Sequence, residues 1–488
     1  MCTLTAAPAC TPPAPPPVAT STPTPTPTAP ATTSRVPAVA EVIPTGDFSP
    51  VSRLVDEAIS ASRLPGAVVQ VGHAGQIVFR QAFGSRKLAG EPGLDGSPAP
   101  AEPMTEDTIF DLASLTKSLA TATAVMQLYE QGRVRLDEPV QTYLPDFNPA
   151  DDPRRAQVTL RMLLTHTSGI AGDLSLDGPW GLDKADKAEG VRRALAAWVV
   201  FGPGELFHYS DVNFIILGAL LEKITGQPED VYVQRNVFAP LGMSDTRYLP
   251  ATKACGPHRI RGTAIALEPR GSAAGRCPDG TWSTELLGRI APTALDEDTP
   301  GINPDYGHPL RGTVHDPTAR RMGGVAGNAG VFTTVHDVGL FAQALLDRLA
   351  DRPSTFPLTR SSVQTMTTPQ QPGHHPGQVE DANEADESAS NTTDPLLAAD
   401  YPAVPGQDLR GFGWDIDTPH SRPRGAVFPV GSFGHTGFTG VTLWMDPRSN
   451  TYVIVLANVI HQRGGPPIAT LSGHVATETA RALHLYGT

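Results

Sequence analysis

Ser114 and Lys117 are the residues whose types and spacing first indicate chemistry in this chain. They lie three positions apart in FDLASLTKSLATATAVMQLYEQG, where apolar residues recur at a helical period. On a helix, the hydroxyl and the amine would share one face about one turn apart. A serine hydroxyl needs a nearby base to become a good nucleophile, and burial lowers a lysine pKa because it disfavours the charged form. The pair predicts a nucleophile with its base, although a helix-capping serine and a surface lysine would have the same spacing.

Two polar triplets further along the chain could complete such a site. The triplet Tyr-Ser-Asp at 209–211 stands just before the apolar helix pattern VNFIILGALL, and His-Thr-Gly at 435–437 lies in the glycine-rich strand pattern FGHTGFTG. The sequence holds no Gly-x-Ser-x-Gly turn, which disfavours a Ser-His-Asp triad of the α/β-hydrolase kind.

The elements that must position these residues come from both ends of the chain. An amphipathic helix over 51–59 precedes two strands, AVVQVGH and QIVFRQAFG, that form a hairpin around Ala74-Gly75. Near the other end, the strands VTLWMD and TYVIVLANVI are followed by a last helix. This pattern predicts an α+β fold in which an antiparallel sheet is built from both chain ends and flanked by helices, with a mainly helical subdomain inserted between them.

Composition and charge narrow the possible partners. The chain has 488 residues, of which 40% are hydrophobic, and a formal net charge of −13. That charge argues against nucleic acid or an anionic membrane surface as the main partner. No run of 18 apolar residues predicts a transmembrane helix. The sequence gives no basis for an oligomeric state.

Residues 1–45 differ from the rest of the chain. They are mostly Pro, Thr, Ala and Ser, which predicts a disordered, extended tether ahead of a folded domain over 46–488. Cys2 and Cys10 precede the tether, where a bacterial lipoprotein carries its lipidated cysteine. No complete signal peptide is visible. We nevertheless expect an exported protein, periplasmic or extracellular, with a possible membrane tether through a lipidated cysteine.

Two stretches, 251–310 and 369–406, are expected to be irregular insertions. The first contains Cys255 and Cys277 in Gly/Pro-rich sequence, which suits one disulfide, although two reduced thiols are the alternative. The second contains EDANEADESASNTTDP, which predicts a disordered surface loop. Neither the cysteines nor the pair His374-His375 has metal-site spacing, so we expect no metal and no cofactor.

Taken together, the three motifs in this order resemble the class C β-lactamase and penicillin-binding-protein superfamily, which includes D-Ala-D-Ala carboxypeptidases, D-aminopeptidases and esterases. The resemblance covers roughly residues 48–486. It extends to GRVRLDEPVQTYLP, VTLRMLLTHTSGI and GGVAGNAGVFTTVHDVGLFAQALL. These stretches make the resemblance specific for the superfamily, while the substrate stays open.

The resemblance implies catalytic roles for three side chains. Ser114 corresponds to the acylated nucleophile, Lys117 to the base, and Tyr209 to the group that passes a proton to the leaving group and later activates water. Because Lys117 and Tyr209 share this task, they are assigned as a coupled pair. The backbone N–H groups of Ser114 and Phe438 would form the oxyanion hole.

The substrate-binding residues implied by the resemblance include two departures from the commonest pattern. Thr436 would contact a substrate carboxylate or polar group, and Gly437 would let the substrate backbone approach. His435 replaces the usual lysine, offers little charge at pH 7, and is expected to become charged toward pH 6. Asp211 stands where class C β-lactamases carry Asn. It can only accept hydrogen bonds when ionised, and it favours the ammonium form of Lys117.

Three functions are compatible with these residues. The first is an exported serine hydrolase that acts on esters or on D-amino-acid amides from cell-wall peptides. The second is a true class C-type β-lactamase, and the third is a penicillin-binding or muropeptide-sensing module without turnover. The expected partner is thus a small-molecule or peptidoglycan-derived substrate.

Five other polar or aromatic residues receive structural interpretations. We expect His166 to stabilise a turn, Asn328 to set loop geometry, and His315 and Asp316 to pack beside the cleft. Trp444 is expected in the core or at an interface.

Overall fold

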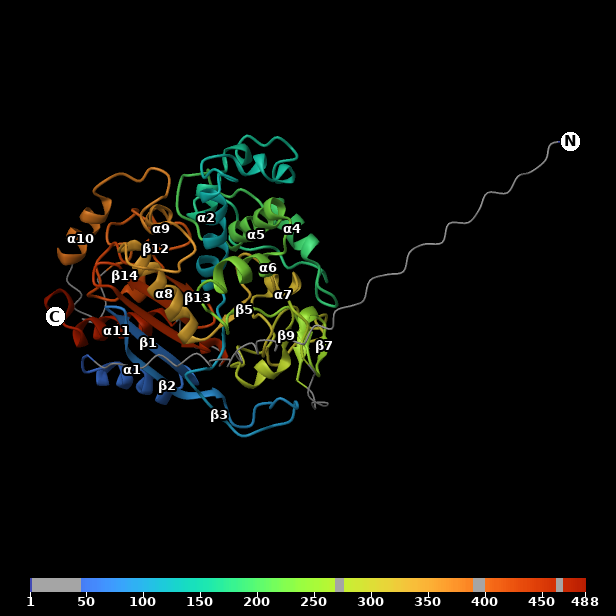
Figure 1. Ribbon diagram of the computed structural model, residues 1–488, viewed down its shortest axis with the longest axis horizontal. Helices are drawn as coiled ribbons and strands as arrows, with labels where there is room; N and C mark the ends of the chain where they lie inside the picture. Colours follow the sequence, from blue (N-terminus) through green and yellow to red (C-terminus); the bar gives the residue numbers. More distant parts are fainter. Residues whose placement is uncertain (2–44, 268–275, 389–399, 462–467) are drawn as a thin grey trace. The chain divides into compact units, whose positions relative to one another are not determined.

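A broad antiparallel sheet forms the centre of the computed structural model (Figure 1). Among the described residues this sheet has eight strands, and all neighbours in it run antiparallel. In spatial order they are β11 (Leu409–Arg410), β12 (Asp415–Asp417), β13 (Phe433–Gly437), β14 (Val441–Asp446), β15 (Thr451–Ala457), β1 (Gly66–His73), β2 (Gln76–Lys87) and β3 (Glu102–Pro103).

The pairing of β1 with β15 joins the two ends of the chain. Ala67 lies opposite Ala457 and His73 lies opposite Thr451, so the register holds along the whole length of β1. The hairpin around Ala74-Gly75 and the strands near the C-terminal end are present as expected. The predicted α+β fold, with a sheet made from both chain ends, is confirmed.

Alternate residues of the central strands pack on opposite faces of the sheet. Val69 and Val455 pack with α1 (Ser49–Ser60) and α11 (Ala469–Ala482), whereas Val68 and Ile454 belong to the larger core on the other side. This period of two is what a strand buried on both faces requires. Helix α8 (Val335–Leu349) covers that second face, where it contacts β1, β14 and β15.

A mainly helical part lies between the two ends of the chain (Figure 1). Helix α5 (Asp211–Thr225) begins after Ser210, which is its N-cap, and ends at Gly226, which adopts a left-handed conformation. The other helices are the π-helix η1 (Lys117–Ala122), α2 (Thr123–Glu130), α3 (Leu160–Leu164), α4 (Lys187–Leu195), α6 (Glu229–Val233), the π-helix η5 (Gln234–Phe238), α7 (Pro317–Arg321) and α9 (Arg360–Thr367). A small sheet in the order β4 (Phe110–Asp111), β10 (Val331–Thr333) and β5 (Arg247–Tyr248) links this part to the rest.

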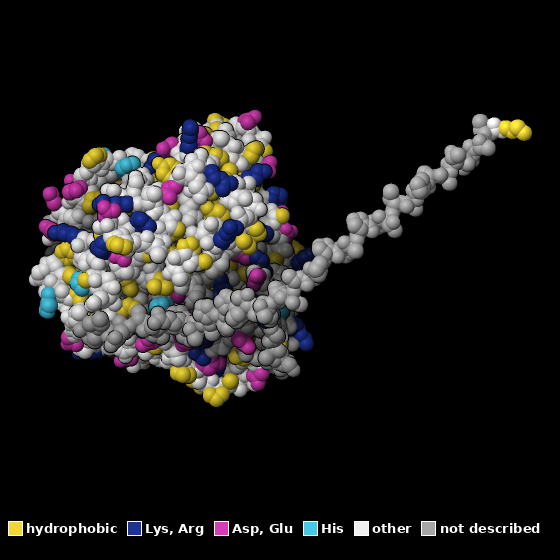
Figure 2. Space-filling model, in the orientation of Figure 1, with side chains coloured by type: hydrophobic (Ala, Val, Ile, Leu, Met, Phe, Trp, Pro, Cys, Tyr) yellow, Lys and Arg dark blue, Asp and Glu magenta, His cyan; other side chains and the backbone are white. Residues whose placement is uncertain are grey.

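The structure describes residues 1, 45–267, 276–388, 400–461 and 468–488. Glu41–Thr488 form one compact unit. The predicted tether lies outside the described residues, apart from Met1 and residue 45, and so do Cys2 and Cys10. Within the described part of the chain, no helix combines the length and hydropathy that a membrane span needs. On the face shown in Figure 2, acidic and basic side chains are interspersed.

The acidic stretch after residue 377 differs from its prediction. Gln378–Ser388 form helix α10, so the expected disordered loop is wrong for these residues, while 389–399 lie outside the described part. Ala382 is fully buried, and the Asn383 side chain exchanges hydrogen bonds of 2.9 and 2.8 Å with the backbone of Val430. Asp386 pairs with Arg424 at 3.0 Å. These specific contacts outweigh a composition that by itself favours disorder.

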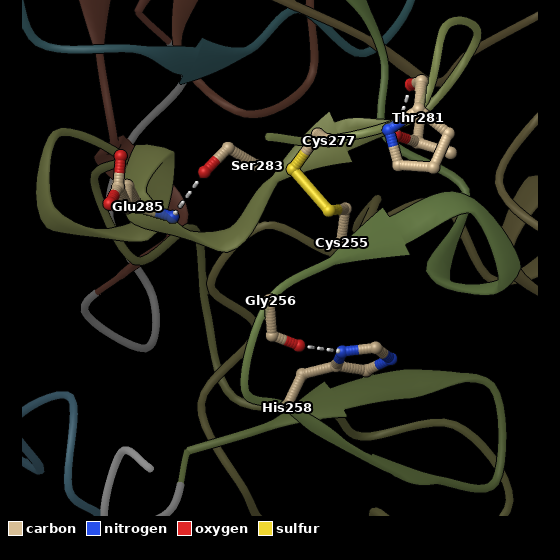
Figure 3. The surroundings of a disulfide bond; sticks show 8 residues. Cys255, Gly256, His258, Cys277, Thr281, Ser283 and Glu285 are labelled. Atoms are coloured by element: carbon tan, nitrogen blue, oxygen red, sulfur yellow. Dashed lines mark hydrogen bonds between the residues drawn. A yellow bond between two sulfur atoms is a disulfide. The ribbon is translucent and has the colours of Figure 1, made fainter. Parts of the chain in front are cut away.

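The first insertion contains short strands and the expected disulfide (Figure 3). Cys255 bonds to Cys277 with their Cα atoms 5.8 Å apart. Cys255 ends β6 (Ala254–Cys255), which pairs with β9 (Trp282–Ser283), and the Trp282 indole donates to the Pro250 carbonyl at 2.9 Å. The strands β7 (Arg259–Arg261) and β8 (Ala264–Ala266) form a second small pair. This stretch is therefore only partly irregular.

We predict that replacing both cysteines, Cys255→Ser with Cys277→Ser, lowers the free energy of unfolding by about 3 kcal/mol, the loss expected when a loop of this length is no longer closed. Urea unfolding with and without reductant measures the effect. Reductant should not lower the free energy of unfolding of the double variant any further. Alkylation of the unreduced, denatured protein that labels Cys255 or Cys277 would refute the bond.

Candidate active site

Ser114 lies in a tight turn between β4 and η1. The preceding residue, Ala113, has a φ of +44°, a backbone conformation that a residue with a Cβ rarely adopts. Asp111 holds this turn, because its Oδ1 accepts the Ala113 N–H at 2.9 Å. The strained turn thus has a fixed support directly beside the nucleophile.

Asp111 also connects the turn to the two neighbouring walls of the site. Its Oδ2 accepts the His315 N–H at 2.7 Å, and its backbone carbonyl accepts the Thr439 hydroxyl at 2.7 Å. Burial raises the pKa of Asp111 to about 6, although these N–H groups act in the opposite direction. The nucleophile turn, the His315 segment and the turn after β13 are therefore held together by one residue, Asp111.

Lys117 places its amine in contact with three acceptors. Its Nζ lies 2.9 Å from Ser114 Oγ, 3.1 Å from the Asn328 carbonyl oxygen and 2.6 Å from Asp211 Oδ1. The side chain is fully buried. These three acceptors match the three N–H groups of an ammonium ion.

The net effect on the pKa of Lys117 is opposite to what burial alone predicts. Burial lowers this pKa, but Asp211 and Tyr209 raise it by more, so the pKa lies above its ordinary value. The expectation that burial prepares a neutral amine is wrong for the resting site, whereas the expected opposing effect of Asp211 is confirmed. Lys117 rests as an ammonium group that donates to Ser114.

Tyr209 is half-buried and packs against His166 beside the amine. The two rings stack with centroids 4.4 Å apart, and Lys117 Nζ lies 5.1 Å from the centre of the tyrosine ring. Burial raises the pKa of Tyr209, and the nearby Lys117 charge only partly offsets this. The phenol is therefore protonated in the resting site and is able to donate its proton.

His435 is buried on β13 and is neutral. Its Nδ1–H donates to the Thr436 carbonyl at 2.6 Å. Burial lowers the pKa of His435 to about 3, and the opposing effect of Asp415 does not compensate. The expectation that acidification toward pH 6 charges this residue is wrong, because desolvation of the imidazolium ion outweighs its neighbours.

Gly437 and Phe438 form the edge of the site at the end of β13. A Cβ on Gly437 would come within 2.4 Å of the Leu112 carbonyl oxygen, so the nucleophile turn itself requires a glycine here. The Phe438 side chain is 74% exposed and its ring stacks on His315 at 5.9 Å. The N–H groups of Ser114 and Phe438 have no acceptor among the described residues, and Thr436 is half-buried beside them.

Two residues given structural interpretations contact the catalytic groups directly. Asn328 supplies the carbonyl that accepts from Lys117, and its amide lies 3.4 Å from Asp211 Oδ2. His166 stabilises a turn as expected, with a φ of +56°, but its Nδ1 also accepts the Ser210 N–H at 3.0 Å. Neither role has a sequence signal, because one uses a backbone atom and the other depends on a left-handed residue.

The remaining expectations hold in part. Asp316 caps α7 through the Ala319 N–H at 2.6 Å, and burial, then the charge of Asp211, raises the pKa of Asp316 to about 6. Trp444 is a core residue whose indole donates to Ser432 Oγ at 2.9 Å. Among the described residues, no group of three His, Cys, Asp or Glu side chains suits a metal ion.

The fold and this site belong to a recognisable class, the serine hydrolases of β-lactamase fold. The family model "Beta-lactamase" matches residues 51–471, and the chain belongs to this family. It is 28% identical over 408 residues to a protein of Escherichia coli (strain K12) named "Putative D-alanyl-D-alanine carboxypeptidase", covering 80% of this chain and 78% of that protein. It is also 28% identical over 424 residues to "N-acetylmuramyl-L-alanine amidase" of Bacillus subtilis (strain 168), covering 84% of this chain and 81% of that protein.

A solved structure gives the same assignment of the fold. The chain superposes on a penicillin-binding-protein homologue from Caulobacter crescentus with a TM-score of 0.58, at 17% identity, covering 90% of this chain and 99% of that one. Members of this family are hydrolases with a serine mechanism.

We predict that Asp211→Asn shifts the acid limb of the pH–rate profile toward lower pH. The carboxylate raises the pKa of Lys117, so its removal lets the amine lose its proton at a lower pH. Steady-state rates between pH 5 and pH 10 measure the limb. Asp177 is exposed, so Asp177→Asn is the matched control and should leave the pH–rate profile unchanged. A limb that stays fixed, or moves to higher pH, would contradict the assigned pair.

Proposed function

We propose that this chain is a serine hydrolase that forms an acyl-enzyme on Ser114 and acts on esters or on D-amino-acid amides from cell-wall peptides. The contact of 2.9 Å between Lys117 Nζ and Ser114 Oγ is the observation that carries the proposal. The neutral phenol of Tyr209 and the open N–H groups of Ser114 and Phe438 support it. They would protonate the leaving group and stabilise the tetrahedral oxyanion, respectively.

The resting charges define which form of the site can react. Ser114 attacks the substrate carbonyl carbon when a neutral Lys117 takes its proton, and Tyr209 delivers a proton to the departing group as the bond breaks. Lys117 then returns a proton to Tyr209, water attacks the acyl-enzyme, and the proton that the water loses passes through these two groups to Ser114 Oγ as the acid departs. Because Asp211 favours the ammonium form, the reactive form is the minor one at pH 7, and its population grows as the pH rises.

The charge around the site favours substrates without a carboxylate. His435 carries no charge at neutral pH, and Arg410, the nearest arginine on the sheet edge, is already paired with Asp415. Asp211 and Asp316 add negative charge beside Lys117. A penicillin carries a carboxylate and an acyl amide. In this site the Lys117 cation is already paired with Asp211, and Asp211 stands where an Asn would donate to the acyl amide. A small ester needs only the nucleophile, the proton donor and the oxyanion hole.

We predict that a fluorophosphonate labels Ser114 covalently and that Ser114→Ala abolishes the label. Lys117→Ala should slow acylation by roughly two orders of magnitude, the usual cost of losing a general base. Ser118→Ala is the control, since this hydroxyl donates to the Gly413 carbonyl at 2.6 Å, away from the amine. Peptide mapping that places the adduct on another serine would rule out the mechanism.

We further predict that short-chain aryl esters are hydrolysed with a kcat/KM roughly tenfold or more above that of any β-lactam, the scale of one missing charged hydrogen bond. Asp211→Asn should reduce this preference, because it restores the amide donor. Parallel assays with an aryl acetate and a chromogenic cephalosporin at pH 7 measure the ratio. A faster reaction with the cephalosporin would favour the true β-lactamase.

The third candidate, a non-turnover penicillin or muropeptide sensor, differs in the fate of the acyl group. Stable labelling by a fluorescent penicillin would favour the sensor, whereas a burst followed by release would favour an enzyme. The presence of Ser114, Lys117 and Tyr209 in contact disfavours a pure binding module, which would not need all three.

We infer that the folded part acts outside the cytoplasm, on a peptidoglycan-derived or other small substrate. The Cys255–Cys277 disulfide is typical of an oxidising compartment. The names of the curated relatives refer to cell-wall peptide bonds. Attachment to a membrane through a lipidated Cys2 or Cys10 stays a prediction.

A further inference from the structure

A cluster of buried polar side chains lies behind Tyr209, on the side of the sheet edge. Arg410 of β11, Asp415 of β12, His435 of β13 and His166 are each at most 1% exposed. Arg410 lies opposite Asp415 in the sheet, and Asp415 lies opposite Gly434. We call these four side chains the rear cluster.

Arg410 and Asp415 form the charged part of the rear cluster. They make a fully buried ion pair, and Asp415 also accepts the Thr418 hydroxyl at 2.8 Å. The Arg410 guanidinium carbon lies 5.9 Å from the ring centre of Tyr209 and 5.5 Å from that of Phe207. These distances are within the range of a cation–π contact.

Arg410 uses fewer of its N–H groups than Arg321, another fully buried arginine. Arg321 is equally buried, and each of its three nitrogens donates to a carbonyl, hydroxyl or carboxylate oxygen. In contrast, Nε and Nη2 of Arg410 have no acceptor within the described part of the chain. Only the carboxylate of Asp415 and the two aromatic faces hold this guanidinium.

Several side chains contact the Tyr209 ring, including His420 at 5.1 Å and His435 at 6.1 Å. Arg410 contacts it at 5.9 Å, and His166 stacks on it at 4.4 Å. His166 keeps its orientation because its Nδ1 accepts the Ser210 N–H, one residue along from Tyr209. Arg410 lies on the edge strand β11, and β12 separates this strand from β13, which carries the His-Thr-Gly triplet.

We propose that Arg410 is a positioning residue that holds the Tyr209 ring so that its hydroxyl can protonate the leaving group. This inference rests on the proposed function. Arg410 is fully buried and does not contact substrate, so it acts only through Tyr209. The aromatic contact fixes the tilt of the ring, and Asp415 fixes the position of the guanidinium relative to β13.

This role predicts a selective defect. A nitrophenolate leaves without a proton, whereas an alkoxide or an aniline must be protonated as it departs. A disturbed Tyr209 should therefore impair alkyl esters and D-amino-acid anilides much more than a nitrophenyl ester. A general loss of structure would impair all three substrates alike.

The test uses the double substitution Arg410→Met with Asp415→Asn, because removing one partner alone would leave a buried charge unpaired. In the full chain, we expect the ratio of kcat/KM for nitrophenyl acetate to that for an ethyl ester or anilide to rise about tenfold, the size of a lost buried cation–π contact. Arg410→Lys keeps the ion pair but not the planar contact, and should raise the ratio severalfold. This single variant decides the question if the double variant does not fold.

A second buried arginine further along the chain, Arg424, provides a matched control. Arg424 and Asp417 form another fully buried pair, and the Arg424 guanidinium lies 5.2 Å from the ring centre of Tyr401, which is not in the site. Because Arg424 also pairs with Asp386 at 3.0 Å, the control replaces all three partners. Arg424→Met with Asp417→Asn and Asp386→Asn should leave the substrate ratio unchanged. An unchanged ratio in Arg410→Lys, or an equal rise in the control, would overturn the proposal.

Labelling separates this inference from the proposed function. Wild-type protein that a fluorophosphonate does not label at Ser114 would refute the serine mechanism itself, and the role of Arg410 with it. Wild-type protein that is labelled, together with variants whose substrate ratio is unchanged, would refute only the role of Arg410.

Discussion

The Lys117 ammonium and the Asp211 carboxylate lie 2.6 Å apart, and the lysine side chain is fully buried. A buried charge is stable only when it is paired and its hydrogen-bonding capacity is used. Lys117 meets this condition through Ser114, Asn328 and Asp211, which come from three distant segments of the chain. The nucleophile turn, the start of α5 and the loop before β10 must all be in place before the amine is satisfied. The ion pair thus makes the geometry of the site and the fold of the helical part depend on each other.

Two residues near this pair have backbone conformations that are rare for residues with a Cβ, and a specific contact stabilises each of them. Ala113 adopts a left-handed φ, and Asp111 accepts its N–H. His166 also has a positive φ, and its ring is held between the Ser210 N–H and Tyr209. Strain of this kind persists where the surrounding structure over-determines it, which is common at functional sites. Here it fixes the nucleophile and its proton donor before substrate arrives.

The sequence predicted the parts that follow from periodicity and from fixed spacing. The β1–β2 hairpin, the last strands and the terminal helix are readable because alternation and helical periods are local. The relation of Ser114 to Lys117 is equally local, so the resemblance could identify it. The sign of the Lys117 pKa shift could not be read, since it depends on how close Asp211 comes in space. Helix α10 was missed because its contacts, such as those of Ala382, Asn383 and Asp386, are tertiary and come from an otherwise acidic stretch. The role of the Asn328 carbonyl could not be seen at all, because every residue has one.

The pairing of β1 with β15 has a consequence for the order in which the protein can form. Ala67 pairs with Ala457, although most of the folded chain separates them in sequence. The pairing of β1 with β15 therefore has the largest sequence separation in the sheet. During synthesis the hairpin of β1 and β2 emerges early, yet one edge of β1 stays unpaired until the final strands arrive. Such long-range pairing is slow, and an open strand edge can pair with other chains in the interval. A nascent chain with this topology cannot complete its sheet until β15 has been made, so the sheet forms only after the helical part has been synthesised.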